Sequence, residues 1–414
     1  MSTTLADPVQ STGRARPLVA LLGPAFVAAI AYVDPGNVAS NISAGAQFGY
    51  LLVWVIVMAN VMAGLVQFLS AKLGLVTGMS LPEAVRECAS RPVRLAYWGQ
   101  AETVAMATDL AEVVGGAIAL NLLFGLPLVV GGLITGVVSM CLLVVQDRRG
   151  QRPFERVITG LLAIIAVGFL ASVVIAPPSA SGALGGLAPR FDGAESVLLA
   201  AAMIGATVMP HAVYLHSGLA RDRHGHPAPG PVRVRLLRAT RLDVVLAMLL
   251  AGTVNLAMLL MAANTLRGKE VDSIESAHAA VGDALGPAAA LLLAVGLLAS
   301  GLASTSVGAY AGAMIMQGLL RRTIPLLLRR SITLVPAIVI LGAGIDPTRA
   351  LIVSQVVLSF GIPFALIPLV RFTSDRELMG ADVNHRVTTG LAWLVALIIS
   401  LLNIALIYLT VTGA

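Results

Sequence analysis

The stretch AYVDPGNVAS, residues 31–40, decides the fold together with a second stretch, GATVMPHAVY, at residues 205–214. Each lies inside a long apolar segment and contains a proline, which removes a helix hydrogen bond and interrupts a spanning helix. In the first stretch, Gly36 adds a flexible backbone beside the proline. One such interruption alone is an ordinary proline kink, which membrane helices tolerate. Two of them predict a pair of broken helices.

The composition places both stretches in a membrane. Of the 414 residues, 57% are hydrophobic and 12% are charged, against roughly 25% charged in a soluble domain. The mean hydropathy is +0.90, and 41 Gly and 21 Pro are scattered through apolar sequence, as in spanning helices. Two cysteines are too few for a disulfide framework or a cysteine-based metal site. A soluble globular protein, a disordered chain and a coiled coil are excluded.

Long apolar segments predict eleven spanning helices. Their approximate spans are 17–44, 48–72, 93–124, 126–146, 156–177, 194–220, 239–265, 287–318, 323–345, 349–371 and 387–411. The basic residues test this count, because cytoplasmic loops collect Arg and Lys. With the N-terminus inside, 23 of the 27 basic residues lie on the cytoplasmic side and 4 lie outside. An odd number of helices then places the C-terminus outside.

The two interruptions divide the chain into equivalent halves. They fall in helices one and six, each the first of five, which predicts an all-α integral membrane protein with a five-plus-five inverted repeat and discontinuous helices 1 and 6. We expect a cytoplasmic tail at 1–16, repeats at 17–177 and 194–371, and an eleventh helix at 387–414. A cytoplasmic linker is expected at about 221–238. Secondary transporters of this architecture bind their substrate at mid-membrane between the broken helices.

The residues at the interruptions suit a divalent cation. A carboxylate at bilayer depth, here Asp34, costs roughly 2.5 to 3.5 kcal/mol on insertion scales and calls for a function. Asn37 offers an amide oxygen, and freed carbonyls at Ala31 and Ala206 offer two more. Met209 offers a soft thioether, which favours Mn2+, Fe2+, Co2+ or Cd2+ over Mg2+ and Ca2+. The alternative is that this residue is a core methionine, one of 14 in the chain.

With its DPGN and MPH motifs, the chain resembles the Nramp family of proton-coupled divalent metal transporters, in particular the bacterial manganese transporters. Further similar stretches are MATDLAEVVG, ASGLASTSVGAYAG and VSQVVLSFGIPFALIPL, and the resemblance covers nearly the whole sequence. It implies the eleven-helix fold. It also implies a metal site made by residues of the two interruptions and of helix ten: Asp34, Asn37, Met209, the Ala206 carbonyl and, in some conformations, the Ala31 carbonyl and Gln355.

Three acidic residues of helix three, Glu102, Asp109 and Glu112, share one helical face. They must point into the bundle, where Arg329 and Arg330 of helix nine are the available counter-charges. A structural ion-pair network and a proton route both fit this pattern. The family resemblance supports the proton route.

A histidine at the second interruption, His211, is a candidate proton acceptor, because imidazole titrates near neutral pH. A buried core histidine is the alternative. No GxxxxGK[ST] motif occurs, so the energy for transport is expected from ion gradients.

We expect a transporter that imports Mn2+, and also Fe2+, with protons by alternating access. Arg outnumbers Lys 25 to 2, which suggests a GC-rich bacterial genome and hence an inner or plasma membrane. No resident cofactor, nucleic acid or obligatory protein partner is implied. The alternative is a transporter of the same fold for an organic substrate. A membrane enzyme would pair its acids about a cleft, and a passive channel would not need two broken helices.

Overall fold

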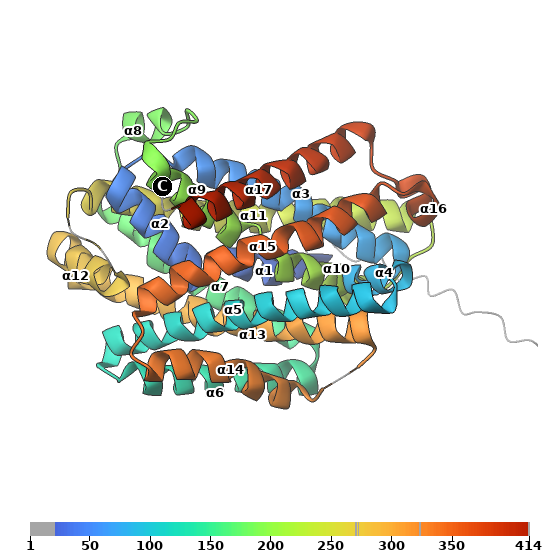
Figure 1. The fold of residues 1–414 in the computed structure, drawn as a ribbon, viewed down its shortest axis with the longest axis horizontal. Coiled ribbons are helices and arrows are strands. Elements are labelled where there is room, and N and C mark those ends of the chain that lie inside the picture. Colours follow the sequence, from blue (N-terminus) through green and yellow to red (C-terminus); the bar gives the residue numbers. More distant parts are fainter. Residues whose placement is uncertain (1–20, 270, 272, 323, 413–414) are drawn as a thin grey trace, which may run out of the picture.

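The computed structural model describes residues 21–412 except 270, 272 and 323. Within these residues the chain is helical and contains no strand. Its long helices run roughly along one axis (Figure 1). The expected tail at 1–16 and the first residues of the first expected helix, 17–20, lie outside the described residues.

The elements of the first half are α1 (Pro24–Ala29), the 3₁₀-helix η2 (Ile30–Val33), α2 (Pro35–Phe48), α3 (Val53–Thr77), α4 (Leu81–Cys88), α5 (Arg91–Phe124), α6 (Leu128–Arg149), α7 (Gln151–Ile175) and α8 (Ala180–Gly185). Those of the second half are α9 (Gly193–Thr207), α10 (Pro210–His224), α11 (Pro231–Thr265), α12 (Ile274–Leu285), α13 (Pro287–Leu320), α14 (Leu326–Gly342), α15 (Pro347–Thr373), α16 (Arg376–Met379), η3 (Gly380–Asp382) and α17 (Arg386–Thr412).

Nine segments of the described chain are long and apolar enough to cross a membrane, with α9 and α10 counted together as one. The two other expected spans are the α1–α2 pair and α14. The first is divided between short helices, and the second has 17 residues with Pro336 inside it. At 1.5 Å per residue α14 is about 26 Å long, somewhat less than the roughly 30 Å hydrocarbon core. The count of eleven therefore stays a prediction.

The helices extend beyond their apolar parts. α10 continues to His224 and α11 begins at Pro231, so the connection between them is 225–230 rather than the expected 221–238. Arginine is a good helix former, and proline at the first helical position loses no helical hydrogen bond. Apolar sequence marks the membrane-buried part of a helix, whereas local propensity and capping set its ends.

Small residues bring the central helices together. α13 packs along α5 and α7, and α11 packs along α2 and α3. A Cβ on Gly301 of α13 would lie 2.9 Å from the backbone nitrogen of Gly116 in α5. Close backbone approach through small residues is the usual way in which spanning helices associate. This contact holds α5, with its three acidic residues, against the centre of the bundle.

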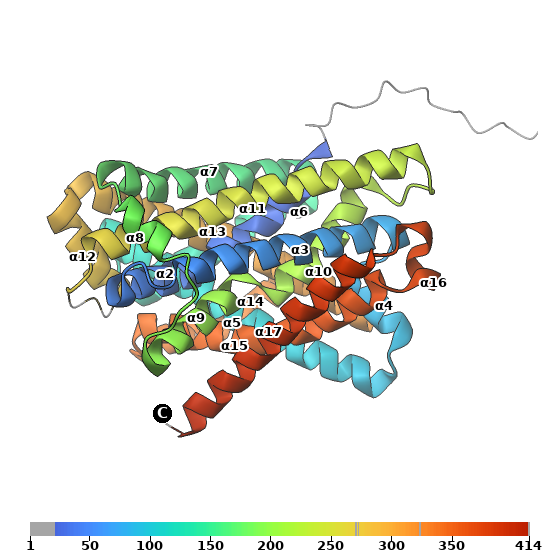
Figure 2. The same ribbon diagram turned by 90° about the horizontal axis from the view of Figure 1, so that it is seen from above.

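Short helices mark the two ends of the bundle. α8 and α12 lie at one end, and α4 and α16 lie at the other, in both views (Figures 1 and 2). α12 lies between α11 and α13 in the chain and ends with Leu285. The end with α4 and α16 also holds the 225–230 connection, and it is the arginine-rich side identified from the sequence.

Candidate functional site

The first interruption is a tightened turn followed by an extended residue. The helix that starts at Pro24 narrows into η2 and stops at Asp34, whose backbone is extended (φ −73°, ψ 167°). Pro35 then takes the first position of α2. Asp34 is thereby the N-cap of α2, and its Oδ1 accepts a hydrogen bond from the backbone N–H of Asn37 at 2.9 Å.

The second interruption has the same plan. α9 ends at Thr207, and the next two residues leave the helical conformation: Val208 has φ −97° and ψ 70°, and Met209 has φ −74° and ψ 123°. Pro210 then opens α10. In both breaks a proline starts the following half-helix, because a residue without N–H fits only where no helical bond is required.

Each proline also frees one specific carbonyl. A helix joins every carbonyl to the N–H four residues later. Pro210 has no N–H to donate to Ala206, and Pro35 has none to donate to Ala31. The two carbonyls expected to be metal ligands therefore stand at equivalent positions in the two breaks.

Asn37 joins the two breaks. Its Nδ2 donates to Asp34 Oδ1 at 2.6 Å and to the Ala206 carbonyl, 169 residues along the chain, at 2.9 Å. The Thr207 hydroxyl, 3.4 Å from Asn37 Oδ1, donates its proton to the Met203 carbonyl at 2.7 Å. The two acceptors at Nδ2 determine how the amide is oriented. Coordination of a cation through Asn37 Oδ1 would require the amide to turn.

A third element, α15, reaches the same carboxylate. Gln355 Nε2 donates to Asp34 Oδ2 at 3.3 Å. Gln355 Oε1 is buried and has no hydrogen-bond partner among the described residues. A Cβ on Gly36 would overlap the Gln355 amide, so glycine at this position is what admits the α15 side chain. An unpaired oxygen beside a buried carboxylate is a natural ligand for a cation.

These groups are sealed from solvent. Asp34, Asn37, Ala206 and Met209 are all 0% exposed. The carboxylate sits at the N-terminus of α2, where the partial positive charge of the helix favours an anion. The arrangement is an occluded site that holds one formal negative charge.

The donor set fits a soft-to-intermediate divalent ion. It combines one carboxylate, amide and carbonyl oxygens and the thioether of Met209, which stands in the same break as the Ala206 carbonyl. In the described part of the chain, no group of three or more His, Cys, Asp or Glu side chains could hold a metal.

His211 lies in the first turn of α10 and faces α5. Its Nδ1 is 3.4 Å from the hydroxyl of Thr108, and its Nε2 is buried with no partner within the described ranges. Thr108 directly precedes Asp109 in α5. The histidine is therefore placed between the second break and the acidic face of α5.

Two of the three α5 acids form ion pairs with α14. Glu102 binds Arg329, with Oε1 and Nη2 2.7 Å apart. Asp109 forms an ion pair with Arg330, which also donates to Ser139 Oγ (2.9 Å) in α6 and to Thr305 in α13. Arg330 is 0% exposed. A buried guanidinium with a carboxylate and two hydroxyls satisfies the requirement that buried charges be paired.

Glu112 differs from the other two acids. It is 0% exposed, and neither carboxylate oxygen has a hydrogen-bond partner in the part of the chain described. The neighbouring hydroxyl of Ser304 donates to the Ser300 carbonyl at 2.8 Å instead. The Glu112 carboxyl also lies against Gly308, whose missing side chain leaves it room. A buried acid without a partner is a candidate proton carrier.

Uncharged residues that sequence reasoning missed support the first break. Asn255 Nδ2 of α11 donates to the Tyr32 carbonyl at 2.6 Å, and Ser300 Oγ of α13 donates to the Val33 carbonyl at 2.5 Å. These bonds satisfy carbonyls that the unwound turn takes out of the helix ladder. The signal was present as polar residues in apolar helices, but many Ser and Asn residues share it.

Toward the arginine-rich end, another set of polar contacts joins the helices that surround the site. Gln67 Nε2 donates to the Tyr32 hydroxyl, and Gln67 Oε1 is 2.7 Å from His216 Nδ1. Asp243 of α11 accepts from the backbone N–H groups of Gly23 (3.0 Å) and Ala25 (2.9 Å). α1 and α10 are thereby tied to α3 and α11.

The sequence matches the family model described as "Natural resistance-associated macrophage protein-like" over residues 25–409. It is 71% identical over 394 residues to "Divalent metal cation transporter MntH" of Mycobacterium tuberculosis H37Rv, covering 95% of this chain and 92% of the relative. The protein of the same name from Bacillus subtilis strain 168 is 47% identical over 395 residues, with 95% and 92% covered.

Solved structures are also similar to this chain. The chain superposes on the manganese transporter of Eremococcus coleocola with a TM-score of 0.85 at 31% identity, covering 95% of this chain and 88% of that one. The nucleobase-cation symporter Mhp1 matches with a TM-score of 0.61 at 15% identity, covering 94% and 93%. The second likeness shows a shared fold alone.

Proposed function

The chain belongs to the Nramp family, and on this premise we propose that it imports Mn2+, and also Fe2+, in symport with protons. Family membership makes it a multi-pass membrane transporter of divalent metal cations and not an enzyme. The proposal places it in a bacterial inner or plasma membrane, with the N-terminus cytoplasmic and the C-terminus outside. The metal is cargo and the proton is the coupling ion, so the cycle needs no resident cofactor.

One observation carries the assignment of the site. The Asn37 amide bridges Asp34 in the first break and the Ala206 carbonyl in the second, so the two discontinuous helices meet at one carboxylate. Discontinuous helices that meet at mid-membrane are the substrate sites of inverted-repeat transporters. We propose Asp34, Asn37, Met209 and the Ala206 carbonyl as ligands, joined in part of the cycle by Gln355 and the Ala31 carbonyl.

The closed inner end supports alternating access. Opening the site toward the arginine-rich side requires α1 and α10 to move away from α3 and α11. That movement breaks the bonds of Asp243 to the start of α1 and the contact between Gln67 and His216. We propose that this arrangement, with Asp34 buried and these bonds formed, is an occluded stage of the cycle.

Protons are proposed to leave by a different route from the metal. His211 of the second break contacts Thr108, which directly precedes Asp109 in α5, and Glu102 and Asp109 pair with arginines of α14. A row of guanidinium groups repels a divalent cation but permits proton exchange among carboxyl groups.

The decisive experiment is Mn2+ uptake into proteoliposomes with and without an imposed pH gradient, with internal pH recorded by a dye. Symport predicts that an inward proton gradient accelerates uptake and that Mn2+ acidifies the lumen. Uptake that does not depend on the pH gradient and moves no protons would support metal transport but contradict symport.

Met209 is expected to select metals by softness. In Met209→Ala, Cd2+ uptake should fall roughly tenfold more than Mn2+ uptake, and Ca2+ should compete better, because a thioether binds soft ions preferentially. Met203→Ala is the matched control, since Met203 is a buried methionine of α9 (1% exposed) outside the break. Equal losses for all ions in Met209→Ala would indicate a packing role.

Gly36 is expected to matter through the room it leaves for Gln355. In Gly36→Ala the new Cβ displaces the Gln355 amide from Asp34, and the apparent KM for Mn2+ should rise severalfold, about as in Gln355→Ala. The double variant should be no worse than either single variant. Additive effects would show that Gly36 acts on the backbone of the break instead.

A further inference from the structure

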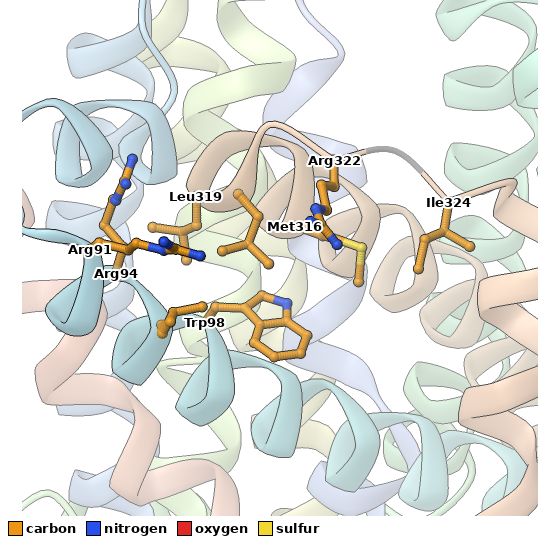
Figure 3. A pocket seen from close by; sticks show the side chains of 9 residues that line it. Arg91, Arg94, Trp98, Met316, Leu319, Arg322 and Ile324 are labelled. Atoms are coloured by element: carbon orange, nitrogen blue, oxygen red, sulfur yellow. The ribbon is translucent and has the colours of Figure 1, made fainter.

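A cavity of about 650 Å³ opens at the arginine-rich end of the bundle, away from the proposed metal site. It lies between the start of α5, the end of α13 and the segment leading into α14. Its lining combines three basic side chains with an apolar surface: Arg91, Arg94, Arg322, Trp98, Leu95, Met316, Leu319, Leu320 and Ile324. In Figure 3, Arg94 and Arg322 approach the space above Trp98 from opposite sides.

The charges in this cavity have no carboxylate counter-ion in the described part of the chain. Among the described residues, no carboxylate lies within ion-pair distance of Arg91, Arg94 or Arg322. The nearby Glu87 is already shared by Arg86 (3.0 Å) and Arg321 (3.5 Å). Three guanidinium groups around one cavity with no acid in its lining favour an anion with several oxygens.

Two further features of the lining indicate that the ligand has both a hydrogen-bond acceptor and an apolar part. Trp98 lines the cavity, and its indole Nε1 is buried without a hydrogen-bond partner within the described chain. A buried donor of this kind normally has an acceptor. The rest of the lining is apolar and includes the exposed side chains of Leu95 (47% exposed) and Ile324 (36%), which can face lipid tails.

We propose that this cavity is a binding site for an anionic phospholipid of the adjacent leaflet. The headgroup phosphate would bind Arg94, Arg91 and Arg322, and an acyl chain would lie along Leu95 and Leu320. Basic pockets between spanning helices on the positive side of a membrane protein have the chemistry to bind such headgroups. A free phosphate or nucleotide would use the arginines but leave the apolar lining without a partner.

The site has a structural connection to the interior. Trp98 stands one helical turn before Glu102, which pairs with Arg329 at 2.7 Å. A lipid bound at Trp98 therefore contacts α5 and α13 beside the first charged pair of the acidic face. Lipid composition is expected to influence the protein through this position.

The test uses the full-length protein, delipidated in detergent, with binding followed by native mass spectrometry. Wild type should bind dioleoyl-phosphatidylglycerol in preference to dioleoyl-phosphatidylcholine. Arg91→Gln/Arg94→Gln/Arg322→Gln should weaken phosphatidylglycerol binding roughly a hundredfold, and Trp98→Phe severalfold. The control Arg148→Gln/Arg149→Gln/Arg376→Gln removes three charges from exposed positions outside the cavity and should bind as wild type.

Several outcomes would overturn the proposal. They are unchanged binding in the cavity variant, equal binding of phosphatidylcholine, or equal weakening in the control, which would indicate diffuse surface charge. Displacement of the lipid by millimolar inorganic phosphate would show a site for soluble anions. If the triple variant does not fold, as judged by its melting temperature, Arg94→Gln and Trp98→Phe measured singly give the same decision.

Discussion

Asp34→Asn is expected to reduce Mn2+ uptake by at least roughly a hundredfold while the protein still folds and inserts. Asp34 is the sole carboxylate of the two breaks, so its loss removes the only formal negative charge of the proposed donor set. Asparagine keeps the size of the side chain and one oxygen that can cap α2. Binding and proton coupling should therefore fail together.

The measurement is initial Mn2+ uptake into proteoliposomes, with isothermal titration for binding and a melting curve for folding. Asp192→Asn, in the exposed segment before α9, is the matched control and should transport as wild type. Wild-type uptake by Asp34→Asn would remove Asp34 from the proposed site.

The second large effect is expected at the buried charged residues Asp109, Glu112 and Arg330. Asp109→Asn and Glu112→Gln should lower Mn2+-coupled proton flux about tenfold or more while Mn2+ binding stays measurable. Arg330→Ala leaves Asp109 buried and uncompensated, which destabilises by roughly 3 to 5 kcal/mol. The double variant Asp109→Asn/Arg330→Gln should recover most of that stability, because no unpaired charge stays behind.

Parallel Mn2+ and pH-dye fluxes in the same vesicles decide between the two routes. Asp222→Asn is the control, since it removes an exposed acid that pairs with its neighbour Arg221 at 2.8 Å. Suppose that Asp109→Asn, Glu112→Gln and Arg330→Ala all lose Mn2+ binding as completely as Asp34→Asn while proton flux persists. The separate proton route would then be wrong, and α5 would belong to the metal path.

The sequence located the two breaks because each joins a proline to an unusual residue in an apolar helix. The local geometry could be anticipated only in part. That Asp34 is an N-cap bonded to Asn37, rather than a free side chain, depends on the extended backbone at one residue. That the Asn37 amide reaches Ala206 depends on how the two halves pack, which no local pattern encodes.

The charged network shows the same division. Helical periodicity placed the α5 acids on one face and identified Arg329 and Arg330 as counter-charges. It could not predict which arginine pairs with which acid, because Arg329 and Arg330 are consecutive and their side chains point about 100° apart. The structure directs one arginine to Glu102 and the other to Asp109. Uncharged partners such as Gln67 were missed because an uncharged polar residue stands out less in an apolar helix than a charged residue does.

The proline that opens each half-helix makes the proposed metal site sensitive to substitutions at a residue that is not itself a ligand. A carbonyl oxygen belongs to every residue type, so substitutions at Ala206 leave that oxygen in place and reveal little about its role. Restoring an N–H at Pro210 would let the helix close over the break and withdraw the Ala206 carbonyl into a backbone hydrogen bond. Variant surveys of this chain should therefore detect the proposed backbone ligand through substitutions at Pro210, four positions after Ala206.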